Sequence, residues 1–145
     1  MYLDQLQEKV SQGDIFDGLP LSHVAWGTPP HSSLRYVRAI LLTYDCEYDK
    51  PNCKFVLVAE VKPLSLVPEN GRGNVRKNHV ARSFYLQPQG GLEESYVDFR
   101  HVGVLDKRIV EDAFVGGRRI FSLDEDSVLA LQEQLYGFLG YERKG

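Results

Sequence analysis

Runs of apolar residues along the middle of the chain predict a β-sheet. Two near-continuous apolar runs, residues 36–43 and 54–61, have the length and composition of strands that are buried on both faces. We therefore expect both strands at the centre of the sheet, with Pro63 ending the second one. Residues 79–86 and 96–104 alternate well enough between apolar and polar positions to predict two further strands.

The segments around these strands predict one short helix and several loops. Leu3, Leu6 and Val10 have helical spacing, which predicts a short N-terminal helix that ends at Gly13. Residues 12–20 predict a turn that leads into a short extended segment. Three further stretches predict loops or turns: residues 26–33, the polar and mobile segment 69–78, and the turn at 87–91.

The C-terminal part of the chain has the clearest helical pattern. Ser122 and Glu125 have the spacing of a capping box, which predicts the start of a helix. Gly140 is the expected stop. An apolar stripe at spacings of three and four follows the predicted start, and it consists of Val128, Leu131, Leu135 and Phe138. We expect this helix to pack on the sheet and to carry no chemistry.

Composition limits the class of protein. A chain of 145 residues with 43% hydrophobic and 26% charged residues predicts a single globular domain over residues 1–145. A net charge of −3 argues against coating nucleic acid through bulk charge, but it leaves room for a local basic patch. The sequence has no run long enough to span a membrane and no signal-peptide pattern at its start. Two cysteines are too few for a disulfide framework, so we expect free thiols and a cytoplasmic location.

The chain contains one tryptophan, Trp26, in a loop flanked by prolines. This side chain either caps the core or is exposed as a stacking group. Large aromatic side chains bury much apolar area, and we therefore expect Trp26 to be buried.

The order of elements predicts a mostly β fold, a small barrel-like domain with helical additions. Gly13-Asp14-Ile15, the two apolar strands and the late strand resemble the PemK/MazF-like toxin family, and residues 99–110 are similar to that family's segment before its last helix. The resemblance covers about residues 12–139. It implies a small SH3-like antiparallel barrel, here with a C-terminal α-helix and a short N-terminal helix. It also implies cleavage of single-stranded RNA without a metal or other cofactor, frequent homodimers, and restraint by an antitoxin.

The resemblance also implies site residues. Cleavage of RNA without a metal needs a base, an acid and a cation that neutralises the phosphorane. In the family, an arginine just before the second strand and a hydroxyl residue after the third strand carry much of this work. Arg38 and Arg35 resemble that arginine, and His79 is a candidate acid or base. The sequence departs from the family at the hydroxyl position, where residues 61–64 contain no serine or threonine and Ser65 is the nearest substitute.

Asp45, Cys46, Glu47 and Asp49 form a polar cluster directly after the first apolar strand. One interpretation makes Cys46 a nucleophile activated by a histidine, although neighbouring carboxylates raise the pKa of a thiol. A second interpretation is a divalent metal held by the carboxylates and a histidine. A third makes Cys46 a small buried residue at the strand end, with solvated or ion-paired carboxylates around it.

A basic stretch between the second and third apolar strands suits a single-stranded nucleic acid, whose phosphates attract cations and whose bases stack on aromatic rings. The candidate residues for this contact are Arg72, Arg76, Lys77, Arg82 and Tyr85. The alternative is an ordinary solvated loop in a chain with many charges.

Together these features predict a toxin-like or toxin-derived module that engages single-stranded RNA, an endoribonuclease if it is active. In this interpretation Arg38 or Arg35 stabilises phosphate charge. The first alternative is a non-catalytic protein- or nucleic-acid-binding barrel that has lost the family's active site. The second is a metal- or cysteine-dependent enzyme centred on residues 45–49. The expected partners are RNA, an antitoxin or other protein, and a second copy of the chain, with no membrane.

Overall fold

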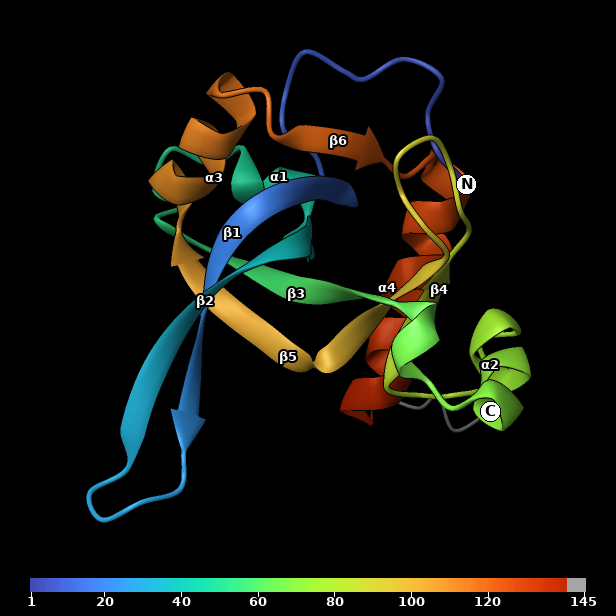
Figure 1. The fold of residues 1–145 in the computed structure, drawn as a ribbon. Coiled ribbons are helices and arrows are strands. Elements are labelled where there is room, and N and C mark those ends of the chain that lie inside the picture. The colour runs from blue at the N-terminus through green and yellow to red at the C-terminus, as the bar shows by residue number, and fades with distance from the viewer. Residues whose placement is uncertain (141–145) are drawn as a thin grey trace.

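Six antiparallel strands form one open sheet in the computed structural model, which describes residues 1–140. The strands are β1 (Asp14–Ala25), β2 (His31–Leu41), β3 (Phe55–Pro63), β4 (Ser83–Leu86), β5 (Ser95–Asp106) and β6 (Arg119–Ser122). Their order across the sheet is β4-β5-β3-β2-β1-β6. The sheet bends strongly, as Figure 1 shows, and its edge strands β4 and β6 are not paired with each other. The central positions of β2 and β3 confirm the prediction from their apolar runs.

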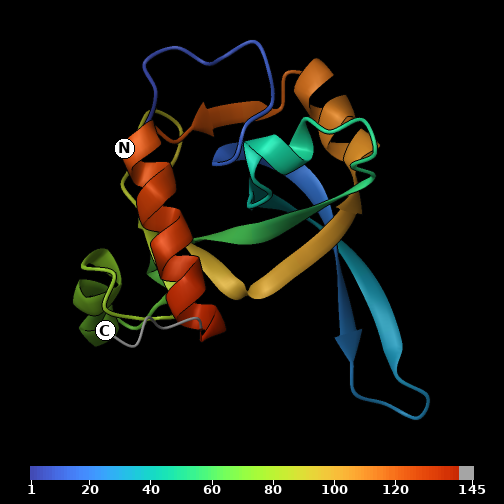
Figure 2. The same cartoon turned by 180° about the vertical axis from the view of Figure 1, so that it is seen from behind.

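Short helices connect the strands, and one long helix follows them. The helices are α1 (Asp45–Tyr48), α2 (Glu69–Arg76), α3 (Lys107–Val115) and α4 (Glu125–Leu139), with a 3-10 turn at Leu64–Leu66. The long helix α4 lies along one side of the bent sheet, next to β4 (Figure 2). None of the helices in residues 1–140 is long and apolar enough to cross a membrane.

The predicted N-terminal helix over residues 3–12 is wrong. This segment is irregular, and its neighbour Tyr2 forms an isolated β-bridge with Leu123. Arg119 supplies the physical reason, because its guanidinium donates to the backbone carbonyls of Lys9, at 2.7 Å, and of Gln7. Carbonyls held by a side chain about 110 residues away are not available to a local helix.

The predicted mobile segment at residues 69–78 is also wrong, because most of it is helix α2. Val75 of this helix is buried against Leu64 and Tyr96 in a small apolar cluster. Arg72 fixes the start of the helix by donating from Nε to the carbonyl of Val67 at 2.8 Å. Tertiary packing therefore outweighs the low helix propensity of the two glycines in the segment.

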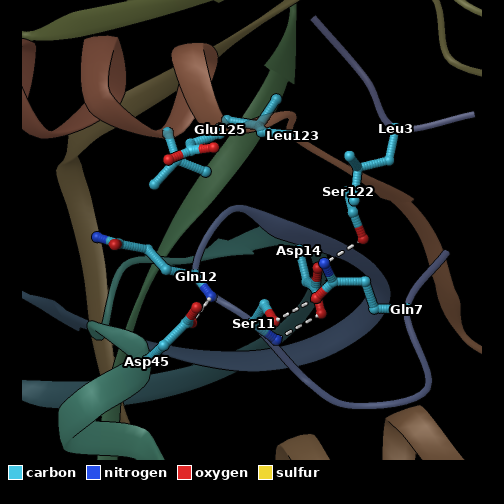
Figure 3. Close-up of a pocket in the computed structure, with 10 residues that line it drawn as sticks. Leu3, Gln7, Ser11, Gln12, Asp14, Asp45, Ser122, Leu123 and Glu125 are labelled. Atoms are coloured by element: carbon cyan, nitrogen blue, oxygen red, sulfur yellow. Dashed lines mark hydrogen bonds between the residues drawn. The ribbon is translucent and has the colours of Figure 1, made fainter.

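The buried Asp14 joins β1 to β6 through Ser122. The predicted capping box between Ser122 and Glu125 is therefore wrong. Ser122 lies in β6, and its hydroxyl donates to Asp14 Oδ1 at 2.5 Å (Figure 3). Helix α4 begins instead at the N-cap Asp124, whose side chain accepts from the amide of Ser127 at 2.9 Å. The predicted stop is confirmed, because Gly140 ends α4 in the left-handed conformation.

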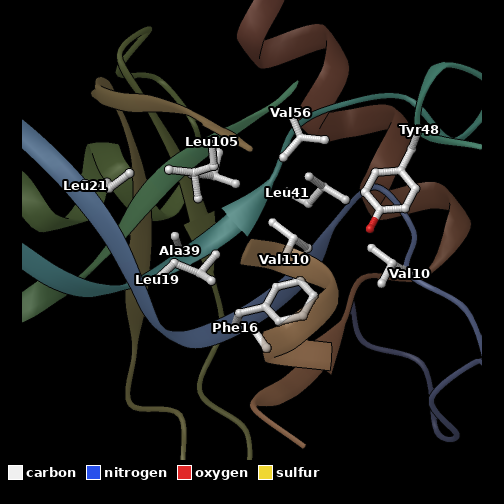
Figure 4. Packing of buried hydrophobic residues seen from close by; sticks show 12 residues of the cluster. Val10, Phe16, Leu19, Leu21, Ala39, Leu41, Tyr48, Val56, Leu105 and Val110 are labelled. Carbon is white, nitrogen blue, oxygen red and sulfur yellow. The ribbon is translucent and has the colours of Figure 1, made fainter. Parts of the chain in front are cut away.

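Two large apolar clusters lie on opposite faces of the sheet, as expected from side chains that alternate along a strand. The first core cluster includes Phe16, Leu19, Ala39, Leu41, Val58 and Val110, as Figure 4 shows for most of these residues. The second includes Ile15, Ile40, Phe84, Val97, Phe99 and Leu131. The predicted stripe of α4 packs into the second cluster, which confirms the role assigned to this helix.

The first hairpin is longer than the pattern predicts. Residues 14–25 form the twelve-residue strand β1, where a turn and a short extended segment were expected over residues 12–20. The loop expected over residues 26–33 is shorter, because β2 already begins at His31. The expectation that Trp26 is buried is wrong, since this residue is 92% exposed.

We expect Leu131→Ala to lower the free energy of unfolding by about 2–4 kcal/mol, because the side chain is fully buried and its removal leaves a cavity. Leu129→Ala, on the exposed side of the same helix, is the matched control and is expected to change it by less than about 0.5 kcal/mol. Urea denaturation measures both. Equal effects would contradict the packing of α4 described here.

Candidate functional site

A groove at Arg38 crosses the sheet from β1 to the beginning of β5. Its volume is about 510 Å³, and we call it the Arg38 groove. It is lined by Asp17, Gly18, Tyr36, Val37, Arg38, Val61, Pro63, Glu93 and Ser95. These residues come from four strands and one loop, so the sheet itself positions the groove.

An irregular step in β1 forms one wall of the Arg38 groove. The pairing with β2 shifts between Phe16 and Leu19, which leaves Asp17 and Gly18 outside the regular register. Gly18 has a φ of +69°, which an L side chain rarely adopts. The shift brings the Asp17 carboxylate next to Arg38, with 2.7 Å between Oδ1 and Nε.

Arg38 is the cation best placed for an anionic ligand. Its side chain is 29% exposed, and Asp17 occupies only Nε. Within residues 1–140, neither Nη nitrogen of Arg38 has a hydrogen-bond partner. A guanidinium with free Nη groups matches the oxygen spacing of a phosphate, which it binds with two parallel hydrogen bonds.

Arg35 lies on the opposite face of β2 and belongs to a separate charge cluster. Its Nη2 donates to the buried Glu60 at 2.8 Å. Next to this pair, Asp98 accepts from Lys62 Nζ at 2.9 Å and from Arg100 Nε at 3.2 Å. His101 lies between the two carboxylates, with Nδ1 3.5 Å from Asp98 and 3.8 Å from Glu60, and it also contacts Lys62.

This cluster holds β2, β3 and β5 together. Burial raises the pKa of Asp98, but hydrogen bonds from Arg100 and Lys62 outweigh burial and lower the pKa to about 2. The carboxylate is therefore charged and fully used by neighbouring side chains. We assign Arg35 a structural role through Glu60, distinct from the groove-lining position of Arg38.

Most of the predicted nucleic-acid contacts are engaged in local structure. Arg76 binds Glu94 with both Nε and Nη2, at 2.8 and 2.9 Å, and the Tyr85 hydroxyl donates to the same carboxylate at 2.5 Å. These bonds lower the pKa of Glu94 to about 2. Arg72 is bound to backbone carbonyls at the start of α2.

Two of the predicted cations remain exposed on this side of the sheet. Lys77 and Arg82 have no ion-pair partner among residues 1–140. They lie next to α2 and β4, while Arg38 lies on β2, so β3 and β5 separate them from the Arg38 groove. The structure does not bring these cations together with Arg38.

The candidate acid or base His79 is also distant from the Arg38 groove. It is exposed after α2, where its backbone amide donates to the carbonyl of Asn74 at 2.9 Å. It does not line the groove, which contains no histidine. The titratable groups that the groove does contain, besides Arg38, are Asp17, Glu93 and Tyr36.

The polar cluster at residues 45–49 forms the short helix α1, and Cys46 is exposed on it. The interpretation of Cys46 as a buried residue at a strand end is therefore wrong, because the chain turns into a helix directly after residue 44. Asp45 points to the N-terminal segment instead, where its Oδ1 accepts from the amide of Gln12 at 2.6 Å (Figure 3). Cys46 and Asp45 do not line the Arg38 groove.

The three carboxylates of this cluster have separate partners. Besides the bond to Asp45, Lys50 binds Glu47 at 2.9 Å and Lys9 binds Asp49 at 3.2 Å. Among residues 1–140, no group of three or more His, Cys, Asp or Glu side chains is arranged to hold a metal ion. The geometry therefore offers no support for a metal centre at residues 45–49.

A second polar cavity, of about 390 Å³, lies beside the start of β1 (Figure 3). Burial raises the pKa of its central residue, Asp14, and hydrogen bonds from Ser122, the Ser11 amide and Arg119 offset part of this effect. Ser122 and Arg119 belong to β6, and Ser11 belongs to the N-terminal segment. The aspartate therefore holds the N-terminal segment and β6 against β1.

Sequence reasoning missed the residues that complete the Arg38 groove. Asp17 comes next to Arg38 only through the irregular step in β1, whereas Tyr36 lies two residues before Arg38 on the same face of β2. The one signal available was the Asp17-Gly18 pair, which is a turn or bulge signature inside a strand-forming stretch.

Comparison with protein-family models and with curated proteins found no relative of this chain. The candidate site is therefore argued from its own residues.

Asp98→Asn tests the charge cluster. The pKa of Asp98 is lower in the folded protein, about 2, than in an unfolded chain, about 3.9. Its contribution is therefore complete above about pH 4 and is lost as the pH falls through about 2. We expect the variant to lower the free energy of unfolding by about 2–3 kcal/mol at pH 7 and by much less near pH 2.

Urea denaturation at both pH values measures this difference. Glu133→Gln makes the same change from carboxylate to amide at an exposed position of α4 and serves as the control. A loss of stability in Asp98→Asn that is equal at pH 7 and pH 2 would contradict the electrostatic role.

Proposed function

We propose that this protein is a toxin-like module of the PemK/MazF-like type that engages single-stranded RNA in the Arg38 groove. In this proposal the bent sheet with α4 packed against it corresponds to the SH3-like barrel of that family. The observation that carries the proposal is the position of Arg38, in a groove across four strands with both Nη nitrogens free within residues 1–140. A phosphodiester is the anion that such a guanidinium fits best.

The polar lining of the groove favours a single strand over a duplex. Its walls include the hydroxyl of Tyr36 and the carboxylates of Asp17 and Glu93, which are hydrogen-bonding groups for bases and riboses. The carboxylates also reduce attraction for phosphates, so the contact with phosphate is confined to the Nη groups of Arg38. The groove then offers one phosphate contact and presents polar groups to the neighbouring bases and riboses.

Cleavage of the bound strand is the second candidate function, and the contact between Asp17 and Arg38 favours it. A carboxylate in this position accepts the proton of a ribose 2′-hydroxyl, whose oxygen then attacks the adjacent phosphorus. Arg38 stabilises the charge that develops on the phosphorane oxygens. The bond to the 5′-oxygen breaks, that oxygen takes a proton from water, and a 2′,3′-cyclic phosphate remains. The groove lacks a histidine, so Asp17 is the base in this scheme in place of His79.

Arg38→Ala is expected to weaken RNA binding about tenfold, because it removes a charge-assisted contact with phosphate. The slope of log affinity against log salt concentration should fall by about 0.7, the value for one phosphate of a single strand. Fluorescence anisotropy of a labelled oligoribonucleotide of about 12 nucleotides, in EDTA, measures both quantities.

Arg108→Ala is the matched control, because Arg108 is an exposed arginine on α3 whose ion-pair partner within residues 1–140 is Asp106. It should leave affinity and salt slope unchanged. Gel analysis of the same mixtures detects cleavage. Cleavage that Asp17→Asn abolishes supports the endoribonuclease, and binding without cleavage supports the non-catalytic module. Equal binding by wild type and Arg38→Ala would refute the proposed site.

A further inference from the structure

A small cavity is lined by α2, β4, β5 and the segments that flank α2. Its volume is about 50 Å³. Valine side chains, among them the buried Val75 of α2, form its apolar part. Arg82, Tyr96 and Arg100 bring polar groups to it, and we call it the Arg82 cavity. It shares no lining residue with the Arg38 groove.

The hydroxyl of Tyr96 is a hydrogen-bonding group that the fold does not use. The residue is only 8% exposed, because its ring packs against Leu64 and Val75. Within residues 1–140 no group forms a hydrogen bond with the hydroxyl, and its oxygen is not sealed off from solvent. A polar group that is largely buried without a partner costs free energy. A ligand in the Arg82 cavity that accepts from this hydroxyl would remove the cost.

Two guanidinium groups line the same cavity, and neither is fully used. Arg82 lies directly before β4, where its carbonyl accepts from the Phe99 amide at 3.0 Å. Its side chain has no ion-pair partner among residues 1–140. Arg100 binds Asp98 through Nε at 3.2 Å and Nη2 at 3.4 Å, which leaves Nη1 without a partner in the described part of the chain. Two cations beside one small cavity repel each other, and a bound anion offsets this repulsion.

The one carboxylate in the lining, Asp98, does not cancel the positive charge. It is 1% exposed and also binds Lys62 Nζ at 2.9 Å. With Lys62 counted, three cations surround the cavity against this single carboxylate. The cavity is therefore electropositive in a chain whose net charge is −3.

The pKa of the Tyr96 phenol reflects these charges. Burial raises this pKa and Asp98 adds to the rise, whereas Arg100 and Arg82 act in the opposite direction. The hydroxyl therefore lies within the electrostatic field of both guanidinium groups.

The size of the cavity limits the ligand. One water needs about 10–15 Å³ of a cavity, so this one has room for about four atoms of that size. A tetrahedral phosphate group fits this limit, whereas a nucleobase exceeds it. Guanidinium groups bind phosphate oxygens with charge-assisted hydrogen bonds, to which a phenol adds one more donor.

We propose that the Arg82 cavity binds one phosphate group, held by the guanidinium groups of Arg82 and Arg100 and by a hydrogen bond from the Tyr96 hydroxyl. This site is separate from the Arg38 groove and does not rest on the proposed function. The phosphate group is free inorganic phosphate or the terminal phosphate of a small phosphomonoester. In the second case the rest of the ligand leaves the cavity beside Arg82, which is exposed.

Isothermal titration calorimetry with inorganic phosphate, at an ionic strength held constant with potassium chloride, tests the site. We expect saturable binding of one phosphate, which Arg82→Ala weakens at least tenfold because it removes a charge-assisted contact. Tyr96→Phe removes only the hydroxyl and is expected to weaken binding about five- to tenfold. The same variant should not lower the thermal unfolding midpoint without phosphate, because the hydroxyl has no partner within residues 1–140. A purely structural role of Tyr96 would give the reverse pattern.

Lys77→Ala is the matched control, because Lys77 is also an exposed cation without an ion-pair partner among residues 1–140 and does not line the cavity. It should bind phosphate like the wild type. Heat that does not saturate, or equal affinity in the wild type and Arg82→Ala, would indicate an adventitious ion only and overturn the inference. Loss of phosphate binding in Arg38→Ala but not in Arg82→Ala would place the anion in the Arg38 groove and overturn it as well.

Phenyl phosphate distinguishes the two sources of the phosphate group. If it binds at least as tightly as inorganic phosphate and Arg82→Ala weakens it equally, the ligand is a phosphomonoester. If inorganic phosphate binds and phenyl phosphate does not, the ligand is free phosphate. Failure to bind RNA with phosphate binding intact would refute the proposed function and leave this site standing.

Discussion

The irregular step in β1 at Asp17 and Gly18 is the constraint on which the Arg38 groove depends. Before the step, Ile15 and Phe16 fill apolar clusters on opposite faces of the sheet. After it, β1 pairs only with β2 among residues 1–140, and Leu19 and Leu21 still pack into the first core cluster. Arg118 stabilises the step with two hydrogen bonds. Its backbone carbonyl accepts from the Asp17 amide at 2.9 Å, and its guanidinium donates to the Gly18 carbonyl at 2.8 Å.

This arrangement separates buried from exposed positions within one strand. The first residues of β1 are buried and bound to two neighbouring strands, so their positions are fixed by the core. Further along the hairpin, residues 22–24 and 28–36 are exposed. Loops and projecting elements on a rigid scaffold are where binding groups concentrate in proteins generally.

The structure confirms several elements that were predicted from local apolar patterns. Elements that depend on contacts between residues far apart in the chain were not predicted correctly. The strands β2, β3 and β5 and the stripe of α4 follow from local apolar patterns. The N-terminal helix failed because Arg119, far away in the chain, binds the carbonyls of its residues. Helix α2 was missed because the burial of Val75, which local propensity does not contain, stabilises it.

The same distinction applies to the candidate site. The resemblance pointed to Arg38 and Arg35 as alternatives, and strand alternation in the structure assigns them to opposite faces, one in the groove and one bound to Glu60. Asp17 was not predicted, because its place beside Arg38 results from a change of register. The exposure of Trp26 could not be predicted from composition either, because it depends on the length of the hairpin.

The buried Asp14 couples folding to proton binding. Its pKa is raised by burial, so the folded chain holds this proton more tightly than the unfolded chain does. Such a group stabilises the fold fully below the unfolded pKa, and that contribution is lost as the pH rises through the raised value. Asp98 acts in the opposite sense, because its pKa is lowered. Asp98 therefore makes the stability rise with pH below the unfolded pKa of about 3.9, whereas Asp14 makes it fall above that value. The two aspartates together give the sheet its largest contribution to stability near the unfolded pKa of an aspartate.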